Sequence, residues 1–322
     1  MTTRKNWEIP DCNYCGSKKY HILYKNLTYW EYPGRFQIVQ CTRCQLVFTS
    51  PRPIPSEIGK YYIQENYFGT QDAGKKNDLT DSITMFSPMY ARIDTEKKPG
   101  KILDIGAGTG SFLYYYKQKG WKVDGVELMK TAVTYAKKHY GITLRNGDFF
   151  DFSFTKKSID VVSLNGALEH VYNPLQTLQR IESLLKDDGL LIFSVPNYAS
   201  VGRILFGRNW FPWQPPRHLY HYSPKVIKKM LRKAGFTNIS ITYNYWLQNY
   251  YILFQSLRYT ASPTFKKTSM GGLVTPFDQR KKTFSLKKYL GKIAGETFAR
   301  ILAFIEPFIK KGEVMIVYAK KN

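Results

Sequence analysis

The sequence predicts a doubly wound α/β fold built on a mostly parallel sheet. From residue 101 to residue 244, short apolar runs of strand length alternate with longer helical patterns, as strands and helices do in βαβ units. One of these runs leads through a glycine-rich turn directly into a helix. This order of strand, turn and helix is typical of parallel sheets that bind a ligand at a helix N-terminus.

The glycine-rich turn follows the first apolar run, Lys101 to Ile105, and precedes the helical pattern Ser111 to Lys119. Gly106, Gly108 and Gly110 allow positive φ in the turn and let the backbone approach a ligand closely. A dinucleotide-binding fingerprint needs its third glycine at position 111, which is a serine here. The pattern therefore disfavours NAD.

The strand ends further along the chain carry side chains suited to an adenosine. The run Lys122 to Glu127 ends in a carboxylate at the distance where a second parallel strand presents it to ribose hydroxyls. Asp148 and Phe149 offer a carboxylate and an aromatic face to an adenine. The buried run Ile159 to Leu164 predicts another strand, which ends at Asn165.

Because of these segments, residues 101–244 resemble the class I S-adenosylmethionine-dependent methyltransferases. The resemblance implies a seven-stranded sheet whose last strand, Glu313 to Ala319, runs antiparallel to the other six. It implies cofactor contacts at Asp104, Gly106, Gly108, Gly110, Glu127, Leu128, Asp148, Phe149 and Asn165, although family members often carry histidine at the last position. The alternative is a doubly wound domain that holds another adenine nucleotide or has lost its ligand.

Four cysteines form two C-x2-C pairs, Cys12 with Cys15 and Cys41 with Cys44. Each pair can place two thiolates on one side of a tight turn, and two such turns make a tetrahedral site for one zinc ion. Because four protein ligands leave no open position, the zinc is predicted to be structural. Two disulfides, disfavoured in a chain without a secretion signal, or a redox pair are the alternatives.

These patterns divide the chain into five parts. They are a zinc-ribbon module (1–50), a linker and helical lid (51–100), an S-adenosylmethionine-binding Rossmann-like domain (101–244), a basic amphipathic insertion (245–311) and the last strand of the Rossmann-like domain (312–322). The sequence shows neither a signal peptide nor an apolar stretch of membrane-spanning length, which favours the cytoplasm.

The formal net charge is +24, and the insertion holds 12 Lys and Arg against 3 Asp and Glu. A surface this basic favours an anionic partner: nucleic acid, a nucleotide-sugar, a phospholipid or a polyprenyl phosphate. The alternative is that the positive charge reflects no partner, because some genomes encode lysine-rich proteins in general.

Within the insertion, residues 286–305 are predicted to form an amphipathic helix. Its apolar face holds Leu290, Ala294, Phe298, Ile301 and Ile305, and its charged face holds Lys288, Lys292, Glu296 and Arg300. Packing of the apolar face on the domain or on a second subunit is favoured over a helix on a membrane surface. Peripheral contact with the inner face of the membrane through 286–309 is the second interpretation.

The aromatic-rich stretch Trp210 to Pro224 follows the fifth predicted strand, Gly189 to Val195, at the place where the sulfonium end of the cofactor would open to substrate. Its aromatic rings, Arg217 and two histidines fit a polar, anionic acceptor. The stretch resembles a segment of zinc-ribbon methyltransferases encoded with bacterial surface-glycan and secondary-metabolite genes. With the cysteines, Pro51-Arg52-Pro53 and Tyr61-Tyr62, that resemblance covers essentially the whole chain but does not fix the acceptor.

A sulfonium is already a reactive methyl donor, so the protein mainly aligns the acceptor and removes its proton. A histidine near its ordinary pKa suits that task, with His218 or His221 as the preferred base and His170 in reserve. A ring that only packs or caps a helix is the alternative for either preferred histidine. We predict O- or C-methylation of a sugar nucleotide or glycan precursor, in polysaccharide biosynthesis.

Two other classes of function compete with this one. An RNA methyltransferase would use the ribbon and the basic surface. Enzymes that methylate exocyclic amines commonly carry an Asn/Asp-Pro-Pro-aromatic tetrad after the fourth strand, where this chain has Asn165-Gly166-Ala167-Leu168, so nucleic acid is the less favoured partner. A protein that binds S-adenosylmethionine without catalysis is the other alternative.

Overall fold

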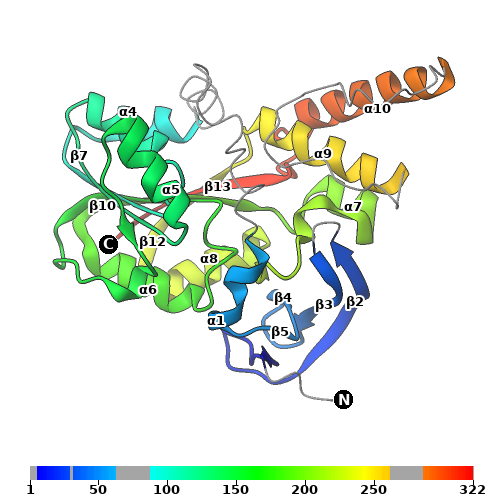
Figure 1. The fold of residues 1–322 in the computed structure, drawn as a ribbon, viewed down its shortest axis with the longest axis horizontal. Coiled ribbons are helices and arrows are strands. Elements are labelled where there is room, and N and C mark those ends of the chain that lie inside the picture. Colours follow the sequence, from blue (N-terminus) through cyan, green and yellow to red (C-terminus); the bar gives the residue numbers. More distant parts are fainter. Residues whose placement is uncertain (1–5, 30–31, 63–87, 262–285, 322) are drawn as a thin grey trace.

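The computed structural model describes residues 6–29, 32–62, 88–261 and 286–321, and its main body is a seven-stranded sheet with helices on both faces (Figure 1). The strand order is β12-β13-β10-β9-β6-β7-β8. The strand β13 pairs antiparallel with β10 and β12, and the other pairs are parallel. The predicted fold class is confirmed. The strands are β6 (Lys101–Ile105), β7 (Lys122–Glu127), β8 (Arg145–Asn146), β9 (Ile159–Asn165), β10 (Leu185–Pro196), β12 (Phe236–Thr242) and β13 (Val314–Lys321).

Side chains alternate between the two faces of this sheet and fill two separate cores. On β10, Leu191 and Phe193 belong to one core, and Leu190 and Ile192 belong to the other. The first core is covered by α6 and α8, and the second by α4, α5 and the helical residues 88–96. The helices of the domain are α4 (Ser111–Gln118), α5 (Lys130–Tyr135) with the π-helical turn η2 (Ala136–Tyr140), η3 (Phe149–Asp151), α6 (Pro174–Leu184), α7 (Val201–Phe206), η4 (Gly207–Asn209), η5 (Phe211–Trp213) and α8 (Pro224–Lys233).

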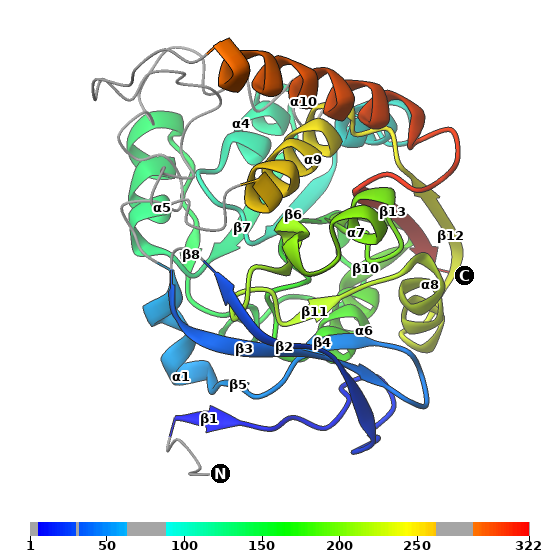
Figure 2. The ribbon, with the colours of Figure 1, turned by 90° about the vertical axis from the view of Figure 1, so that its right-hand side faces the viewer.

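The N-terminal module is a small antiparallel sheet, and one of its strands belongs to the main domain (Figure 2). Its order is β11-β4-β3-β2, and β11 (Tyr220–His221) comes from the aromatic-rich stretch. Phe48 of β4 packs in the same core as Tyr220 and the α6 and α8 residues, so the module and the domain share apolar contacts. The other elements of the module are β1 (Trp7–Glu8), β2 (Tyr20–Tyr29), β3 (Tyr32–Cys41), β4 (Val47–Thr49), β5 (Arg52–Pro53), α1 (Pro55–Ile58) and η1 (Gly59–Tyr61).

The predicted helical lid falls largely on residues 63–87, which lie outside the described residues, so it stays a prediction. The basic insertion contributes two helices, α9 (Trp246–Ala261) and α10 (Leu286–Ile305), which lie side by side in Figures 1 and 2. The predicted bounds of the second helix are confirmed. Over the ranges that the structure describes, no helix is long and apolar enough to cross a membrane.

Candidate functional site

The predicted cofactor loop lies at the carboxyl end of β6, where the chain turns into α4. Gly106, Gly108 and Gly110 have φ values of 76°, 54° and 79°, a region that favours glycine, so the predicted positive φ is confirmed. A Cβ on Gly106 would lie 2.9 Å from the Cβ of Ala167, in the loop after β9. The glycine loop and the loop after β9 are therefore in close contact.

Glu127 ends β7 beside the glycine loop and is 7% exposed. Its two carboxylate oxygens accept hydrogen bonds from the backbone N–H groups of Gly108 and Met129, each at 2.8 Å. Burial raises the pKa of Glu127, and these backbone N–H groups act in the opposite direction. The carboxylate is held in a fixed orientation and keeps lone pairs for the ribose hydroxyls that it is predicted to bind.

Asp104 and Asn165 lie at the ends of two neighbouring strands, β6 and β9. The Ser163 hydroxyl donates to Asp104 Oδ1 at 2.7 Å, and burial raises the pKa of Asp104 to about 7. The Ser194 hydroxyl of β10 donates to Asn165 Oδ1 at 2.5 Å. Hydroxyl groups from adjacent positions of the sheet therefore orient both side chains at the edge where the ligand is predicted.

The part of the site that is predicted to bind adenine holds one exposed aromatic ring that is not among the predicted cofactor contacts. Asp148 is exposed and caps the short helix η3 by accepting from the Phe150 backbone N–H at 2.8 Å. The Phe149 ring is buried, with the Arg180 guanidinium 4.4 Å from its centroid. Phe150 is 47% exposed, and Leu128 after β7 is 65% exposed. The apolar surface open to an adenine at this edge comes from Phe150 and Leu128.

The four cysteines meet at one end of the small sheet, and none is in a disulfide. Cys12 Sγ lies 3.3 Å from Cys44 Sγ, and Cys15 Sγ lies 3.5 Å from Cys41 Sγ. All four sulfur atoms lie within 4.8 Å of one another. A hydrogen bond from the Cys44 thiol lowers the pKa of Cys12 to about 5. This donor set fits the tetrahedral thiolate site of a structural zinc ion, which the four cysteines would hold.

Each C-x2-C pair closes a tight turn of the same kind. The Gly16 N–H donates to the Cys12 carbonyl at 2.8 Å, and the Gln45 N–H donates to the Cys41 carbonyl at 3.0 Å. Gly16 and Gln45 have φ values of 69° and 67°. The two turns are therefore near copies, which aims all four thiols at one point.

Glu169 and His218, which are buried, form a cluster at the loop after β9 with His170, which is partly exposed. The two imidazole rings are 4.7 Å apart and edge to face, and Glu169 and His218 are 3% and 5% exposed. The Leu219 backbone N–H donates to the Glu169 carbonyl at 2.8 Å, which holds the segment 217–219 against this loop. The structure brings together two predicted catalytic residues and Glu169, which the sequence indicates only as a further candidate base beside His170.

Hydrogen bonds to carbonyl groups fix the proton on both rings. His218 Nδ1 lies 2.7 Å from the Pro212 carbonyl, and His170 Nδ1 lies 3.1 Å from the Arg217 carbonyl. A carbonyl only accepts, so Nδ1 carries the hydrogen and Nε2 has the lone pair in each neutral ring. The Tyr62 hydroxyl, 3.1 Å from His170 Nδ1, shares that hydrogen as an acceptor.

The expectation that the base keeps its ordinary pKa is wrong for this structure. Burial, with the nearby Arg217 charge, lowers the pKa of His170 to about 4, and burial lowers the pKa of His218 as well. Burial raises the pKa of Glu169 to about 8. Both rings are therefore neutral at pH 7 and present lone pairs. One ligand atom from each of the three residues lies within 4.8 Å of the others, a spacing at which the cluster can also ligate a metal ion.

His221, predicted from the sequence as a preferred base alongside His218, lies outside this cluster. It is 2% exposed on β11, and its ring centroid is 4.7 Å from that of Trp213. Neither ring nitrogen has a hydrogen-bond partner in the described part of the chain. Burial lowers the pKa of His221 to about 3. Its catalytic role stays a prediction, and its surroundings are those of a packed ring.

The N-terminal module supports the histidine cluster directly. The Thr49 hydroxyl donates to the His218 carbonyl at 2.8 Å, and the Thr49 N–H donates to the Leu219 carbonyl at 3.0 Å. Arg52 donates to the Tyr220 hydroxyl at 2.9 Å and to Glu8 at 2.7 Å. The ribbon is therefore part of the scaffold that positions His218.

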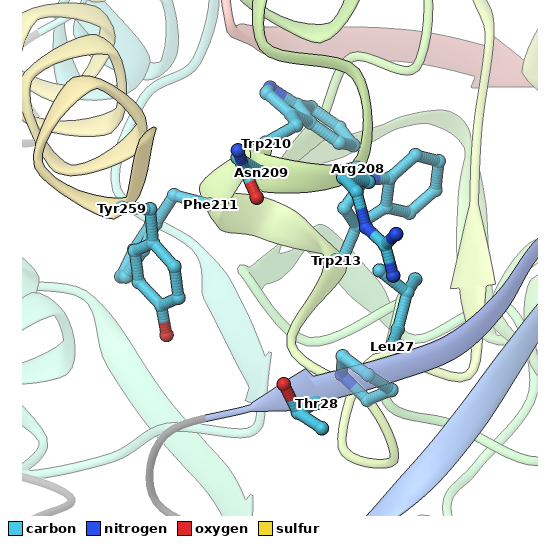
Figure 3. A pocket seen from close by; sticks show the side chains of 9 residues that line it. Leu27, Thr28, Arg208, Asn209, Trp210, Phe211, Trp213 and Tyr259 are labelled. Atoms are coloured by element: carbon cyan, nitrogen blue, oxygen red, sulfur yellow. The ribbon is translucent and has the colours of Figure 1, made fainter. Parts of the chain in front are cut away.

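A pocket lies between the small sheet and the aromatic-rich stretch (Figure 3). Arg208 is exposed, and its hydrogen bonds within the described residues are two contacts of 3.5 Å with the carbonyls of Lys25 and Asn26. Trp213 lines this pocket and contacts His221, which separates the pocket from the histidine cluster. The lining residues are Leu27, Thr28, Arg208, Asn209, Trp210, Phe211, Trp213, Pro215 and Tyr259.

Comparison with known proteins gives matches over the Rossmann-like domain. A family model described as a methyltransferase domain matches residues 76–241. The ubiquinone biosynthesis O-methyltransferase of Actinobacillus pleuropneumoniae serotype 7 (strain AP76) is 33% identical over 107 residues, which are 30% of this chain and 46% of that protein. The enzyme of the same name from Azoarcus sp. (strain BH72) is 27% identical over 162 residues, 45% of this chain and 68% of that protein. The first relative is therefore matched over less than half of its length.

Among solved structures, one similar protein is phosphoethanolamine N-methyltransferase 2 of Haemonchus contortus in complex with S-adenosyl-L-methionine. The TM-score is 0.52 at 17% sequence identity, and the match covers 85% of this chain and 62% of that one. A likeness at this identity shows the fold alone.

Proposed function

Because this chain belongs to the methyltransferase-domain family, we propose that it methylates a hydroxyl or an acidic carbon of a small anionic acceptor, namely a sugar nucleotide or a glycan precursor. The chain has a methyltransferase domain, and we infer that its methyl donor is S-adenosylmethionine. One observation carries the proposed chemistry: two neutral imidazoles with lone pairs at Nε2 lie 4.7 Å apart, His170 in the loop that contacts the glycine loop and His218 in the segment held against that loop. We place the enzyme in the cytoplasm, in polysaccharide biosynthesis.

In this proposal the chain has two tasks. The glycine loop and Glu127 hold the cofactor, which supplies a methyl group on a positively charged sulfur. Nε2 of His218 or of His170 would take the proton from the hydroxyl or carbon being methylated, while that atom bonds to the methyl carbon and the methyl–sulfur bond breaks to leave a neutral thioether. Burial of the cluster keeps water from competing for that methyl group.

The pocket of Figure 3 supports an anionic acceptor. Arg208 presents a guanidinium at its rim, and a guanidinium can pair with a phosphate through two parallel N–H bonds. Trp213 and Tyr259 supply apolar walls on either side. Trp213 stands between this pocket and the histidine cluster, so an acceptor anchored there by a phosphate reaches the cluster only if that side chain moves.

The direct experiment is a methyl-transfer assay across candidate acceptors, with release of the demethylated cofactor as the readout. We expect turnover with one or more sugar nucleotides, and little with neutral sugars or with transfer RNA. On the best acceptor, Arg208→Met should raise KM about tenfold or more and leave kcat nearly unchanged, because it removes a charged hydrogen bond made before and during transfer.

Lys229→Met on α8, which removes an exposed charge away from the pocket, is the matched control and should keep the wild-type KM. Turnover confined to RNA would contradict the proposed acceptor class. Cofactor binding without turnover on any acceptor would contradict catalysis itself.

A further inference from the structure

The helix α10 contacts the rest of the protein through small residues. Ala299 and Ala303 are 1% and 0% exposed and pack against Leu253 of α9. A Cβ on Gly295 would lie 2.6 Å from a methyl carbon of Leu257, so the two helices approach closely at that point. These three small residues form the inner face of α10.

Among the described side chains of α10, Leu302 is partly buried beside the small residues, and the other large apolar residues lie on the other faces and are exposed. Ile301 is 54% exposed, Phe304 is 64% exposed and Phe308, in the turn after the helix, is 75% exposed. Phe298, Ile301 and Ile305 of the predicted apolar face therefore do not pack on the described part of the domain, where the small residues make the contact, and packing of that face on a second subunit stays a prediction. The further exposed members of this surface are Ile293 (43%), Phe298 (46%), Ile305 (44%) and Ile309 (54%).

The charges that accompany this apolar surface are positive. Arg300, Lys310 and Lys311 are exposed. Of the two acidic residues in 293–311, Glu296 is only partly exposed and Glu306 is 1% exposed. An apolar face flanked by cations is the composition of a helix that lies in the headgroup region of an anionic bilayer.

A second copy of this chain is the competing occupant, and the charges disfavour it. In a two-fold interface the same patch meets itself. The patch has several exposed cations and, over 293–311, no fully exposed acidic residue to pair with them. A lipid surface carrying phosphate groups supplies the missing negative charge.

We propose that α10 and the turn after it, residues 286–311, form a membrane-docking surface that binds anionic phospholipid headgroups. Ile301, Phe304 and Phe308 enter the interface between headgroups and acyl chains, while Lys310 and Lys311 contact lipid phosphates. The helix lies along the surface without crossing it, which agrees with its composition. The inference is independent of the methyl acceptor and places the enzyme at the inner face of the membrane.

The test is co-sedimentation of the full chain with vesicles of phosphatidylcholine alone and of phosphatidylcholine with phosphatidylglycerol. The wild type should bind only the anionic vesicles, and added salt should weaken binding by screening the charges. The double variant Phe304→Ser/Phe308→Ser should lower the partition coefficient at least tenfold, because it removes the most exposed apolar anchors. The double variant Lys310→Gln/Lys311→Gln should also lower the partition coefficient. Lowering the salt concentration should not restore it, because the charges that salt screens have been removed.

Ile9→Ser is the matched control, since Ile9 is an exposed apolar residue (65%) on the N-terminal module, and it should bind like the wild type. Circular dichroism and melting temperature establish that each variant is folded. Equal binding of the wild type to both vesicle types, or to neither, would overturn the proposal. So would a concentration-dependent dimer in sedimentation equilibrium that the Phe304→Ser/Phe308→Ser variant loses.

Discussion

His218→Asn and His170→Asn should each lower kcat by about 10²- to 10⁴-fold, the usual effect of removing a general base. Asparagine is the informative replacement, because its amide NH₂ can still donate to the carbonyl that each Nδ1 now contacts. Only the lone pair at Nε2 is lost. Turnover should be measured on the best acceptor, together with cofactor affinity and melting temperature, which we expect to change little.

His139→Asn is the control for this experiment, since His139 is exposed, stacks on Tyr135 and lies away from the cluster. It should keep the wild-type kcat. His221→Asn tests the remaining predicted base, and its surroundings of tryptophan rings predict a loss of stability. Full turnover in both His218→Asn and His170→Asn would contradict a catalytic role for the cluster.

The second large effect is expected from the cysteines. Elemental analysis should find one zinc ion per chain, and Cys15→Ser/Cys44→Ser should lose it. Metal binding and folding are coupled in sites of this kind, with apparent binding free energies on the order of 10 kcal/mol. We therefore expect the small sheet to unfold and the melting temperature to fall sharply. Because Thr49 holds the His218 carbonyl, turnover should fall with it.

Hydrogen exchange can locate this unfolding, with loss of protection expected over β2, β3 and β4. Thr42→Ala provides a control, because it removes a hydroxyl that donates to the Lys19 carbonyl at 3.2 Å but removes no sulfur ligand. It should retain the zinc. Disulfides found by mass spectrometry in fresh wild-type protein, together with absence of zinc, would contradict this account.

Local patterns were sufficient to predict the Rossmann-like domain. The glycine loop, Glu127 at the end of β7 and the last strand β13 each follow from a few adjacent residues, because strand length, turn chemistry and apolar runs are local properties. The cysteine site is equally local, since each C-x2-C pair makes its own turn.

What could not be predicted depends on contacts between distant segments. The strand β11 is only two residues long, too short for any periodicity, and it exists because it pairs with β4. The lowered pKa of His170 comes from burial and from the nearby Arg217 charge, which no sequence spacing encodes. In α10 the apolar pattern was correctly placed, but a pattern does not tell whether a face is covered.

The measurement that tests the central claim most directly is calorimetry with S-adenosylmethionine on the wild type, Glu127→Ala and Gly110→Val. The wild type should bind the cofactor and its demethylated product. Both variants should bind at least tenfold more weakly, since one removes the predicted ribose acceptor and the other places a branched side chain at φ 79°, where its Cβ would lie 3.1 Å from Ala136 Cβ. Tight binding of NADH by the wild type, with no binding of S-adenosylmethionine, would contradict the account.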